Sequence, residues 1–245
     1  MRWKAAILLE IPCRRENRAP PPFGHTIAPL SAFLQARFVS SAAKPADFPH
    51  EAGPELAFAG RSNVGKSSAI NALASRKKLA FFSKTPGRTQ TINFYDLGDG
   101  ARLADLPGYG YASAPKSMRA SWDELIGGYL TRRRSLGAVV LLMDARHPLT
   151  ANDRQFLEWL RPLPTSRLVL LSKSDKLSRA ERAKVLADTR RALDAAAVTS
   201  EVLLFSSRNA EGVEEARTLL EDWLRQWREK PDLRNGNKKP PEKGN

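Results

Sequence analysis

Residues 60–67, which read Gly-Arg-Ser-Asn-Val-Gly-Lys-Ser, restrict the fold of this chain more than any other stretch. Their spacing is GxxxxGK[ST], a glycine-rich loop whose backbone N–H groups can wrap a chain of phosphates. A strand-like apolar run at 55–59 precedes the loop, and a helix-like pattern at 68–74 follows it. This order predicts a P-loop in an α/β fold, with the positive end of a helix dipole at the phosphates.

Each residue of this loop has an expected role. Lys66 is expected to place its charge on the β- and γ-phosphates, and the Ser67 hydroxyl to ligate Mg²⁺. Further nucleotide contacts are expected at Gly60, Arg61, Ser62, Asn63, Val64, Gly65 and Ser68. The alternative is an ordinary glycine-rich turn, and the flanking strand and helix argue against it.

Further apolar runs, at 101–105, 138–143, 167–171 and 201–205, have the length of strands and alternate with helix-like stretches. This alternation predicts a mostly parallel sheet with helices on both of its faces. Two helices carry a single apolar stripe, at Met118, Trp122, Leu125, Ile126 and Tyr129, and at Ala216, Leu219, Leu220, Trp223 and Trp227. Stripes at helical spacing indicate core packing rather than a cofactor site.

Composition limits the class of protein. A chain of 245 residues has room for one α/β domain with loose ends. The single cysteine, Cys13, excludes an intrachain disulfide and the usual cysteine-bound metal clusters, and it fits a reducing, cytoplasmic setting. The formal net charge is +14, of which +7 falls between residues 21 and 224. Such a charge favours a polyanionic partner such as RNA but does not decide the question.

Both ends of the chain are expected to be disordered, because residues 1–32 and 229–245 are rich in proline and charge and lack periodicity. Glu10 ends the apolar run at 5–9 before it reaches the length of a signal peptide. A transit peptide or a misassigned start are the alternatives for the first segment. No stretch approaches the ~20 apolar residues of a membrane span. The folded domain is therefore expected at 33–228, with no membrane association.

The loop after the run at 167–171 predicts which base is bound. The stretch 172–175 fits the pattern [NT]KxD in its last three positions, at Lys173, Ser174 and Asp175. Guanine presents two N–H donors that the Asp175 carboxylate can accept, and adenine has no such pair. Lys173 is expected to lie along the nucleotide and brace the loops. Ser172 replaces the usual Asn or Thr, and its hydroxyl can still tie this loop to the P-loop.

The run at 101–105 ends in a DxxG motif made of Asp105, Leu106, Pro107 and Gly108. Asp105 is expected to hold Mg²⁺ through water, and the Gly108 N–H to meet the γ-phosphate. The next residue is Tyr109, where Ras-like enzymes place a glutamine that orients water. Hydrolysis in this chain therefore needs a different device.

Two further loops complete the expected site. Thr89 is the expected Mg²⁺-binding threonine of switch I, with Thr85 as the alternative, and Gly87 and Arg88 are expected beside the nucleotide. After the last strand-like run, Phe205, Ser206 and Ser207 resemble the SA-type loop whose backbone meets guanine O6. Five matches in this order predict a protein that binds GTP with Mg²⁺.

The stretches GRSNVGKSS (60–68), SKTPGRTQTINFY (83–95), DLPGYGYA (105–112), DARHPL (144–149) and FSSRNAEGV (205–213) closely resemble the EngB/YsxC/YihA family of bacterial ribosome-biogenesis GTPases. This family is one of the TrmE-Era-EngA-EngB-Septin-like GTPases, and the resemblance covers residues 33–228. It implies a three-layer P-loop NTPase of the Ras-like kind, with a mostly parallel six-stranded sheet. It also implies a cytoplasmic, monomeric GTP hydrolase that binds GTP or GDP with Mg²⁺. The implied partner is the precursor of the large ribosomal subunit, and the implied role extends to growth and septation.

Several residues keep two interpretations. Some related GTPases bind K⁺ at the position of Asn63, and a loop-stabilising hydrogen bond is the alternative. The arginine run at 132–134 is expected either to contact phosphates or to form a solvated helix end. Stacking faces and charges suited to rRNA occur together in switch I, at Phe81, Phe82, Lys84 and Arg88.

Two other functions compete with a GTPase switch. An ATP-using P-loop kinase is the first, and Asp175 argues against it because it favours guanine. A nucleotide-binding scaffold with little hydrolysis is the second, and Tyr109 favours it because the water-orienting glutamine is missing. The resemblance predicts slow hydrolysis that a partner or a monovalent cation stimulates.

Overall fold

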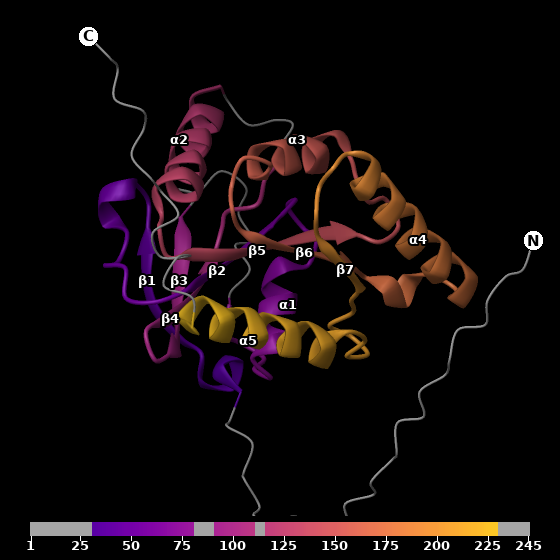
Figure 1. The fold of residues 1–245 in the computed structure, drawn as a ribbon, viewed down its shortest axis with the longest axis horizontal. Coiled ribbons are helices and arrows are strands. Elements are labelled where there is room, and N and C mark those ends of the chain that lie inside the picture. The colour runs from indigo at the N-terminus through magenta and orange to yellow at the C-terminus, as the bar shows by residue number, and fades with distance from the viewer. Residues whose placement is uncertain (1–30, 81–90, 111–115, 230–245) are drawn as a thin grey trace, which may run out of the picture.

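The computed structural model describes the backbone of residues 31–80, 91–110 and 116–229, and the side chains of these residues except 116–123. Seven strands form one sheet in the order β1-β3-β4-β2-β5-β6-β7 (Figure 1). The strands are β1 (Arg37–Ala42), β2 (Glu55–Gly60), β3 (Ile92–Gly98), β4 (Ala101–Asp105), β5 (Leu136–Asp144), β6 (Ser166–Ser172) and β7 (Glu201–Leu204). The helices are α1 (Lys66–Leu73), α2 (Lys116–Arg132), α3 (Ala151–Leu160), α4 (Arg179–Ala195) and α5 (Val213–Glu229), with short 3-10 turns η1 (Ala32–Gln35), η2 (Pro45–Asp47) and η3 (Ser174–Lys176).

The pairing of the strands confirms the predicted α/β class. Strand β2 pairs in parallel with β4 and β5, and the parallel series continues through β6 to β7. Strand β3 pairs antiparallel with β4 and with β1. The sheet has one strand more than the six expected. The edge strand β1 is mostly exposed and its register shifts between Phe38 and Ser40, so it lacks the apolar alternation that identifies a strand in a sequence.

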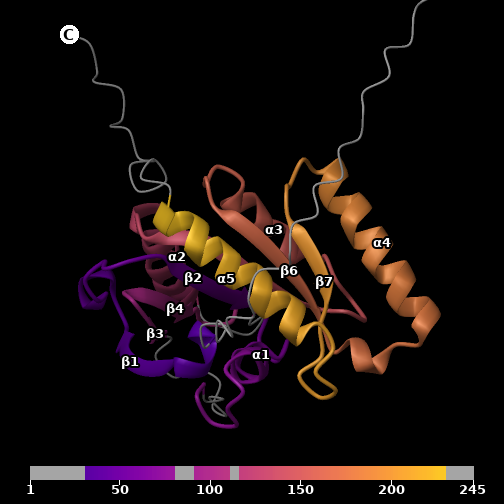
Figure 2. The same ribbon diagram turned by 60° about the horizontal axis from the view of Figure 1, so that its bottom comes forward.

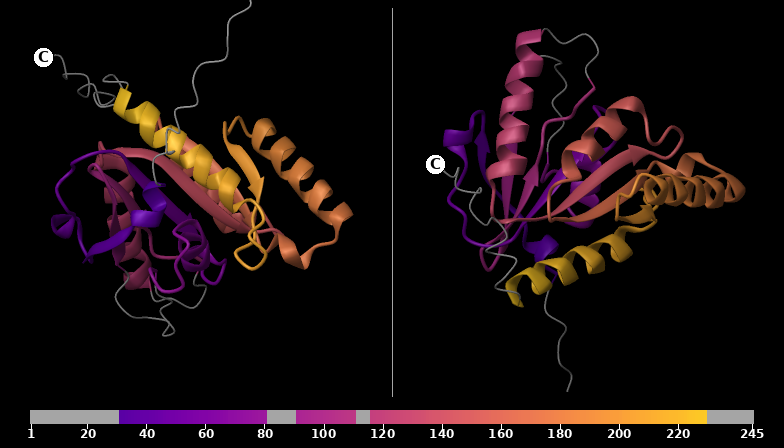
Figure 3. Two further views of the ribbon diagram at one scale, coloured as in Figure 1. Left: turned by 90° about the horizontal axis from the view of Figure 1, so that it is seen from below. Right: turned by 45° about the horizontal axis from the view of Figure 1, so that its top comes forward.

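Helices cover both faces of the sheet, as predicted. Helices α1 and α5 pack on one face, and α2, α3 and α4 lie on the other (Figure 2 and Figure 3). Strand β5 supplies both cores, because successive side chains of a strand point to opposite faces. Val140 joins the cluster that contains Leu220 of α5, whereas Val139 joins the cluster that contains Tyr129 of α2.

The described side chains of the two apolar stripes pack into the core, except that of Trp227, which is partly buried and lines a pocket at the end of α5. In α2 the buried members are Leu125, Ile126 and Tyr129; in α5, Ala216 and Leu220 are buried while Leu219 and Trp223 pack partly buried against them. Met118 and Trp122 lie outside the described side chains. Within the described part of the chain, no helix combines the length and the apolar character that a bilayer span requires.

The folded region begins slightly earlier than residue 33. The backbone N–H of Ala32 donates to Glu221 Oε1 of α5 at 3.1 Å. The following turn, η1, buries Phe33 completely. At the other end, α5 continues to Glu229. The expected disorder of the remaining terminal residues stays a prediction.

Arg133 has neither of the roles expected for the arginine run. Its guanidinium donates to both carboxylate oxygens of Glu55, at 2.9 and 2.6 Å, and only 6% of its side chain is exposed. Glu55, which opens β2, is fully buried and also accepts a hydrogen bond from the Tyr129 hydroxyl at 3.0 Å. Arg133 therefore neutralises the buried carboxylate of Glu55. The two residues are 78 positions apart, so the local sequence does not reveal this contact. Arg132 and Arg134, on either side of Arg133, are not buried in this way.

Candidate functional site

The predicted motifs gather at one edge of the sheet, beyond the carboxyl ends of the parallel strands. Strand β2 ends at Gly60, β4 at Asp105 and β6 at Ser172, and Phe205 directly follows β7. In open α/β sheets this edge is where ligands bind. The topology thus brings together loops that lie far apart in the sequence.

The P-loop runs from the end of β2 to the start of α1. Gly65 is the N-cap residue of α1 and has a φ of 104°, a left-handed conformation that favours glycine. Asn63 is also left-handed, with a φ of 62°. A side chain at Gly60 would bring its Cβ to 2.8 Å from Val64 Cγ1. The two glycines are therefore required by the backbone of the loop, as expected for a phosphate-binding turn.

Two of the residues predicted for the phosphates and for Mg²⁺ meet in the structure. Lys66 Nζ forms an ion pair with Asp105 Oδ1, and the two side chains are 13% and 5% exposed. Ser67 is the second residue of α1. Its hydroxyl and the Asp105 carboxylate are oxygen ligands of the kind that Mg²⁺ prefers. The other predicted residues of this group, Thr89 with Gly87, Arg88 and Thr85, lie outside the described residues.

The DxxG segment lies directly along the P-loop. The N–H of Leu106 donates to the carbonyl of Phe58 at 2.9 Å, and the pairing then continues past the ends of the strands. Ser62 donates its N–H to the Tyr109 carbonyl at 3.0 Å, within an isolated parallel bridge between Arg61 and Tyr109. Gly108 fits closely, because a Cβ at this position would lie 3.0 Å from Ser62 Oγ.

Two hydrogen bonds connect the predicted base-reading loop to the P-loop. The Ser172 hydroxyl donates to the Val64 carbonyl at 2.7 Å, which is the tie expected of this residue. Lys173 Nζ donates to the Asn63 carbonyl at 2.8 Å, so this lysine braces the loops as predicted. Lys173 itself is left-handed, with a φ of 60°. The geometry therefore couples the base end of the site to the phosphate end.

The carboxylate of Asp175 has a fixed orientation. The Ser206 hydroxyl donates to Asp175 Oδ1 at 2.8 Å, and Ser206 is buried. The backbones of the two loops are joined where the Ser174 N–H donates to the Phe205 carbonyl at 3.2 Å. The Phe205 ring belongs to the core, so only its backbone is available to a base, and Ser207 is exposed.

Sequence reasoning assigned no role to Asp144, although it ends β5 as Asp105 ends β4. Arg146 donates to both of its carboxylate oxygens, at 2.9 and 2.7 Å, and Lys173 Nζ donates to Oδ2 at 3.0 Å. The hydrogen bonds from Arg146, followed by those from Lys173, hold the pKa of Asp144 well below its ordinary value although burial opposes them. Its place at a strand end is the signal that could have identified it.

Asn71 was also missed. It is nearly buried in α1, and its Oδ1 accepts the N–H groups of Leu79 and Ala80 at 3.0 and 2.8 Å. Its Nδ2 donates to the Ala80 carbonyl at 3.0 Å. These contacts fix the chain just before the switch I residues. An asparagine inside a helix gives no sequence signal for such contacts.

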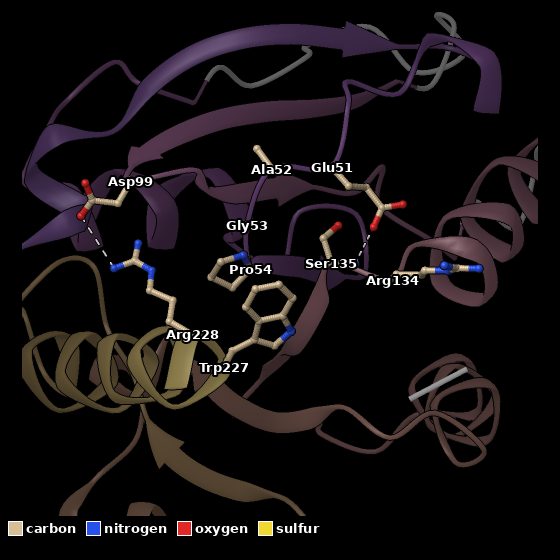
Figure 4. Close-up of a pocket in the computed structure, with 9 residues that line it drawn as sticks. All are labelled: Glu51, Ala52, Gly53, Pro54, Asp99, Arg134, Ser135, Trp227 and Arg228. Carbon is tan, nitrogen blue, oxygen red and sulfur yellow. Dashed lines mark hydrogen bonds and ion pairs between the residues drawn. The ribbon is translucent and has the colours of Figure 1, made fainter. Parts of the chain in front are cut away.

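A separate pocket of about 520 Å³ lies at the opposite ends of the strands (Figure 4). It is lined by Glu51, Ala52, Gly53, Pro54, Asp99, Arg134, Ser135, Trp227 and Arg228, none of which belongs to the predicted motifs. Three of its charged residues have partners within the chain: Arg228 lies 3.7 Å from Asp99, and Glu51 accepts the Ser135 N–H at 2.7 Å. The pocket is thus separate from the nucleotide site.

A P-loop after β2, a DxxG segment paired with it and a guanine-type loop tied to both define a GTP-binding domain of the P-loop class. The family model described as "50S ribosome-binding GTPase" matches residues 55–173. A probable GTP-binding protein EngB of Aromatoleum aromaticum is 52% identical over 195 residues, covering 80% of this chain and 90% of the relative. Another, of Methylobacillus flagellatus, is 50% identical and covers 80% and 94%. The chain belongs to the EngB family of GTP-binding proteins and is a GTP hydrolase.

Among solved structures, a crystal structure of a probable GTP-binding protein EngB aligns with a TM-score of 0.58. The alignment covers 70% of this chain and 99% of that protein, at 23% identity. At this identity the likeness concerns the fold alone. It agrees with the α/β sheet and its two helical layers.

Proposed function

We propose that this GTPase acts in the cytoplasm, as a Mg²⁺-dependent monomeric switch, on the precursor of the large ribosomal subunit. The observation that carries the proposal is the pair of hydrogen bonds from Ser172 and Lys173 to the P-loop, because they couple guanine recognition to the phosphate loops. The description of the matched family as ribosome-binding supports the choice of partner. Effects on growth and septation follow from a reduced supply of ribosomes.

Each part of the site has a task in this proposal. Asp175 accepts the two guanine donors, with Ser206 holding the carboxylate in place. Lys66 leaves Asp105 for the β- and γ-phosphates, and the Gly108 N–H meets the γ-phosphate. Ser67, Thr89 and Asp105 would hold Mg²⁺, which would supply positive charge to the phosphates. Ordering of switch I by GTP creates the state that the partner binds, and hydrolysis releases it.

Asn63 is the candidate ligand for K⁺. The cation would add positive charge at the phosphates and so compensate for the missing glutamine. The left-handed φ of Asn63, 62°, makes glycine the proper replacement, since glycine keeps this backbone and removes only the side chain. GTP turnover of the wild type is expected to be faster in K⁺ than in Na⁺, and Asn63→Gly is expected to lose that difference. Equal turnover of the wild type in both salts would remove the cation from the proposal.

Contact with rRNA is proposed for switch I, whose Phe81, Phe82, Lys84 and Arg88 lie outside the described residues. Reversing the charges at Lys84 and Arg88 is expected to abolish cosedimentation with large-subunit particles, because phosphate contacts depend on positive charge. Unchanged cosedimentation would contradict this contact. Reversal of the charge of Lys184 in α4, an exposed lysine outside the predicted motifs, serves as the matched control.

The decisive experiment compares wild type with Asp175→Asn in cosedimentation with ribosomal subunits. Asparagine presents an amide donor, which fits the oxygen that xanthine carries in place of the guanine amino group. The variant is expected to lose binding with GTP and to regain it with XTP. Cosedimentation of the wild type with ribosomal subunits that is the same with every nucleotide would refute the proposal of a switch.

A further inference from the structure

A buried carboxylate outside the predicted motifs contacts two parts of the nucleotide site and the start of α3. Asp153, in the first turn of α3, is fully buried. Its Oδ1 accepts a hydrogen bond from the Tyr109 hydroxyl at 2.8 Å and lies 3.6 Å from Nε of Arg61 in the P-loop. Its Oδ2 accepts the backbone N–H and the hydroxyl of Thr150, at 2.9 and 2.7 Å. One side chain thus touches the P-loop, the residue after DxxG and the start of α3.

The Tyr109 side chain is held firmly against α3. Its ring stacks on Phe156, with centroids 5.2 Å apart and planes 16° from parallel. Burial, followed by the negative charge of Asp153, raises the pKa of Tyr109 well above its ordinary value, so the phenol stays protonated and donates. Tyr109 occupies the position where Ras-like enzymes carry the water-orienting glutamine. Its side chain is held against α3 instead.

The backbone of Tyr109 is held by a different element. Its N–H donates to the Gly60 carbonyl at 3.3 Å, and its carbonyl accepts the Ser62 N–H at 3.0 Å. Gly108, the residue before it, lies against Ser62 with no space for a side chain. The place of the Gly108 N–H consequently depends on both anchors of Tyr109, the P-loop backbone and Asp153.

We infer that Asp153 is a positioning residue for the recognition of GTP, which holds Tyr109 and thereby places the Gly108 N–H for the γ-phosphate. The inference rests on the proposed contact between Gly108 and that phosphate. GDP has no γ-phosphate, so this positioning affects the binding of GTP and not that of GDP. A carboxylate with a merely structural role affects both nucleotides equally.

The chain contains a matched control for this contact. Tyr129 donates to the buried carboxylate of Glu55 at 3.0 Å, at the far end of the sheet from the P-loop. Tyr129→Phe and Tyr109→Phe each remove one hydroxyl from a buried tyrosine–carboxylate pair and keep the ring. Both variants are expected to be folded and somewhat less stable than wild type.

The test measures the affinities of a non-hydrolysable GTP analogue and of GDP, with Mg²⁺, for the full chain. Tyr109→Phe is expected to lower the affinity for the GTP analogue about tenfold. This is the effect of losing one hydrogen bond to a charged group, here that of the Gly108 N–H to the γ-phosphate. The affinity of this variant for GDP is expected to stay within about twofold, and Tyr129→Phe is expected to leave the ratio of the two affinities unchanged. If Tyr109→Phe changes both affinities equally, or neither, the inference is wrong.

A second variant keeps the inference testable if one hydroxyl has a small effect. Asp153→Asn is expected to weaken the GTP analogue selectively, and the double variant with Tyr109→Phe to be no worse than the more affected single variant, because both act through one contact. Fully additive effects would overturn the inference. Failure of the wild type to bind guanine nucleotides at all would instead overturn the proposed function, so the two failures are distinguishable.

Discussion

The ammonium group of Lys173 lies 2.8 Å from the carbonyl oxygen of Asn63 and 3.0 Å from Asp144 Oδ2. A residue of the base-reading loop thus supports the phosphate-binding loop and is itself held by the end of β5. Asp175, the side chain predicted to read the base, follows two residues later. The loops predicted for the base and for the phosphates are therefore joined by one shared set of contacts.

Loss of the Lys173 ammonium is predicted to lower the affinity for GTP and the affinity for GDP by the same factor. In Lys173→Met the stem and the left-handed backbone remain, and only the two hydrogen bonds disappear. Both affinities are expected to fall about tenfold, as for a charged hydrogen bond. Fluorescent nucleotide binding measures this, with Lys184→Met as the control because the side chain of Lys184 is 80% exposed and pairs with Asp188 of the same helix, at 3.7 Å. A change confined to GTP would contradict the prediction.

The lowered pKa of Asp144 predicts a pH-dependent contribution to stability. A carboxyl group whose pKa is lower in the folded chain stabilises it above the unfolded pKa of ~3.9, and this contribution is lost as pH falls through the folded value. Asp144→Asn is therefore expected to be less stable than wild type at pH 7, by an amount that shrinks below pH ~4. Urea unfolding at pH 7 and at pH 3 measures the difference. The prediction fails if the difference is the same at both values.

Gly108→Ala is predicted to destabilise the chain by ~1–3 kcal/mol, a typical effect of overpacking. The new Cβ would lie 3.0 Å from Ser62 Oγ and 3.2 Å from the Ser62 backbone nitrogen, which is hydrogen-bonded to Tyr109 and cannot retreat freely. GTP affinity is expected to fall with stability. Gly127→Ala in α2 is the control, since it meets nothing within 4 Å and is expected to stabilise the helix by up to ~1 kcal/mol. Thermal unfolding that ranks the two variants equally would contradict this.

Arg133→Met is predicted to cost ~3–5 kcal/mol, because it leaves the buried carboxylate of Glu55 without its closest positive partner. Cosedimentation with ribosomal particles is expected to be unchanged at a temperature where the variant is folded. Arg132→Met, at an exposed neighbouring position, is expected to change stability by less than ~0.5 kcal/mol. Chemical denaturation compares them. Equal stability of both variants would show that the buried pair contributes nothing.

The site residues could be predicted from the sequence where they belong to short motifs at the ends of strands. The P-loop, Asp105 and Asp175 each stand at or just after a strand end, and parallel strands share one carboxyl edge, so their meeting at that edge is predictable from the sequence. The α/β class follows from the same alternation of strands and helices. Ser172 also behaves as expected, since a hydroxyl is enough to reach the Val64 carbonyl.

The sequence failed where a contact joins distant segments. Asp153 reaches Tyr109 across 44 residues, and Arg133 reaches Glu55 across 78. Either side chain taken alone is typical of a solvated helix, and only the packed structure shows its burial. Strand β1 was missed for the opposite reason, because an exposed edge strand carries little apolar pattern.

The bridge between Arg61 and Tyr109 has a mechanical consequence. It extends the pairing of β2 with β4 beyond both strands, so the phosphate cradle is fastened to the chain that leaves Gly108. A partner that pulled this chain outward would break the hydrogen bonds of the bridge one after another, from Tyr109 towards Gly60. Because the hydrogen bonds of the bridge come from Ser62 and Gly60, such a pull would disturb the P-loop backbone without touching a nucleotide.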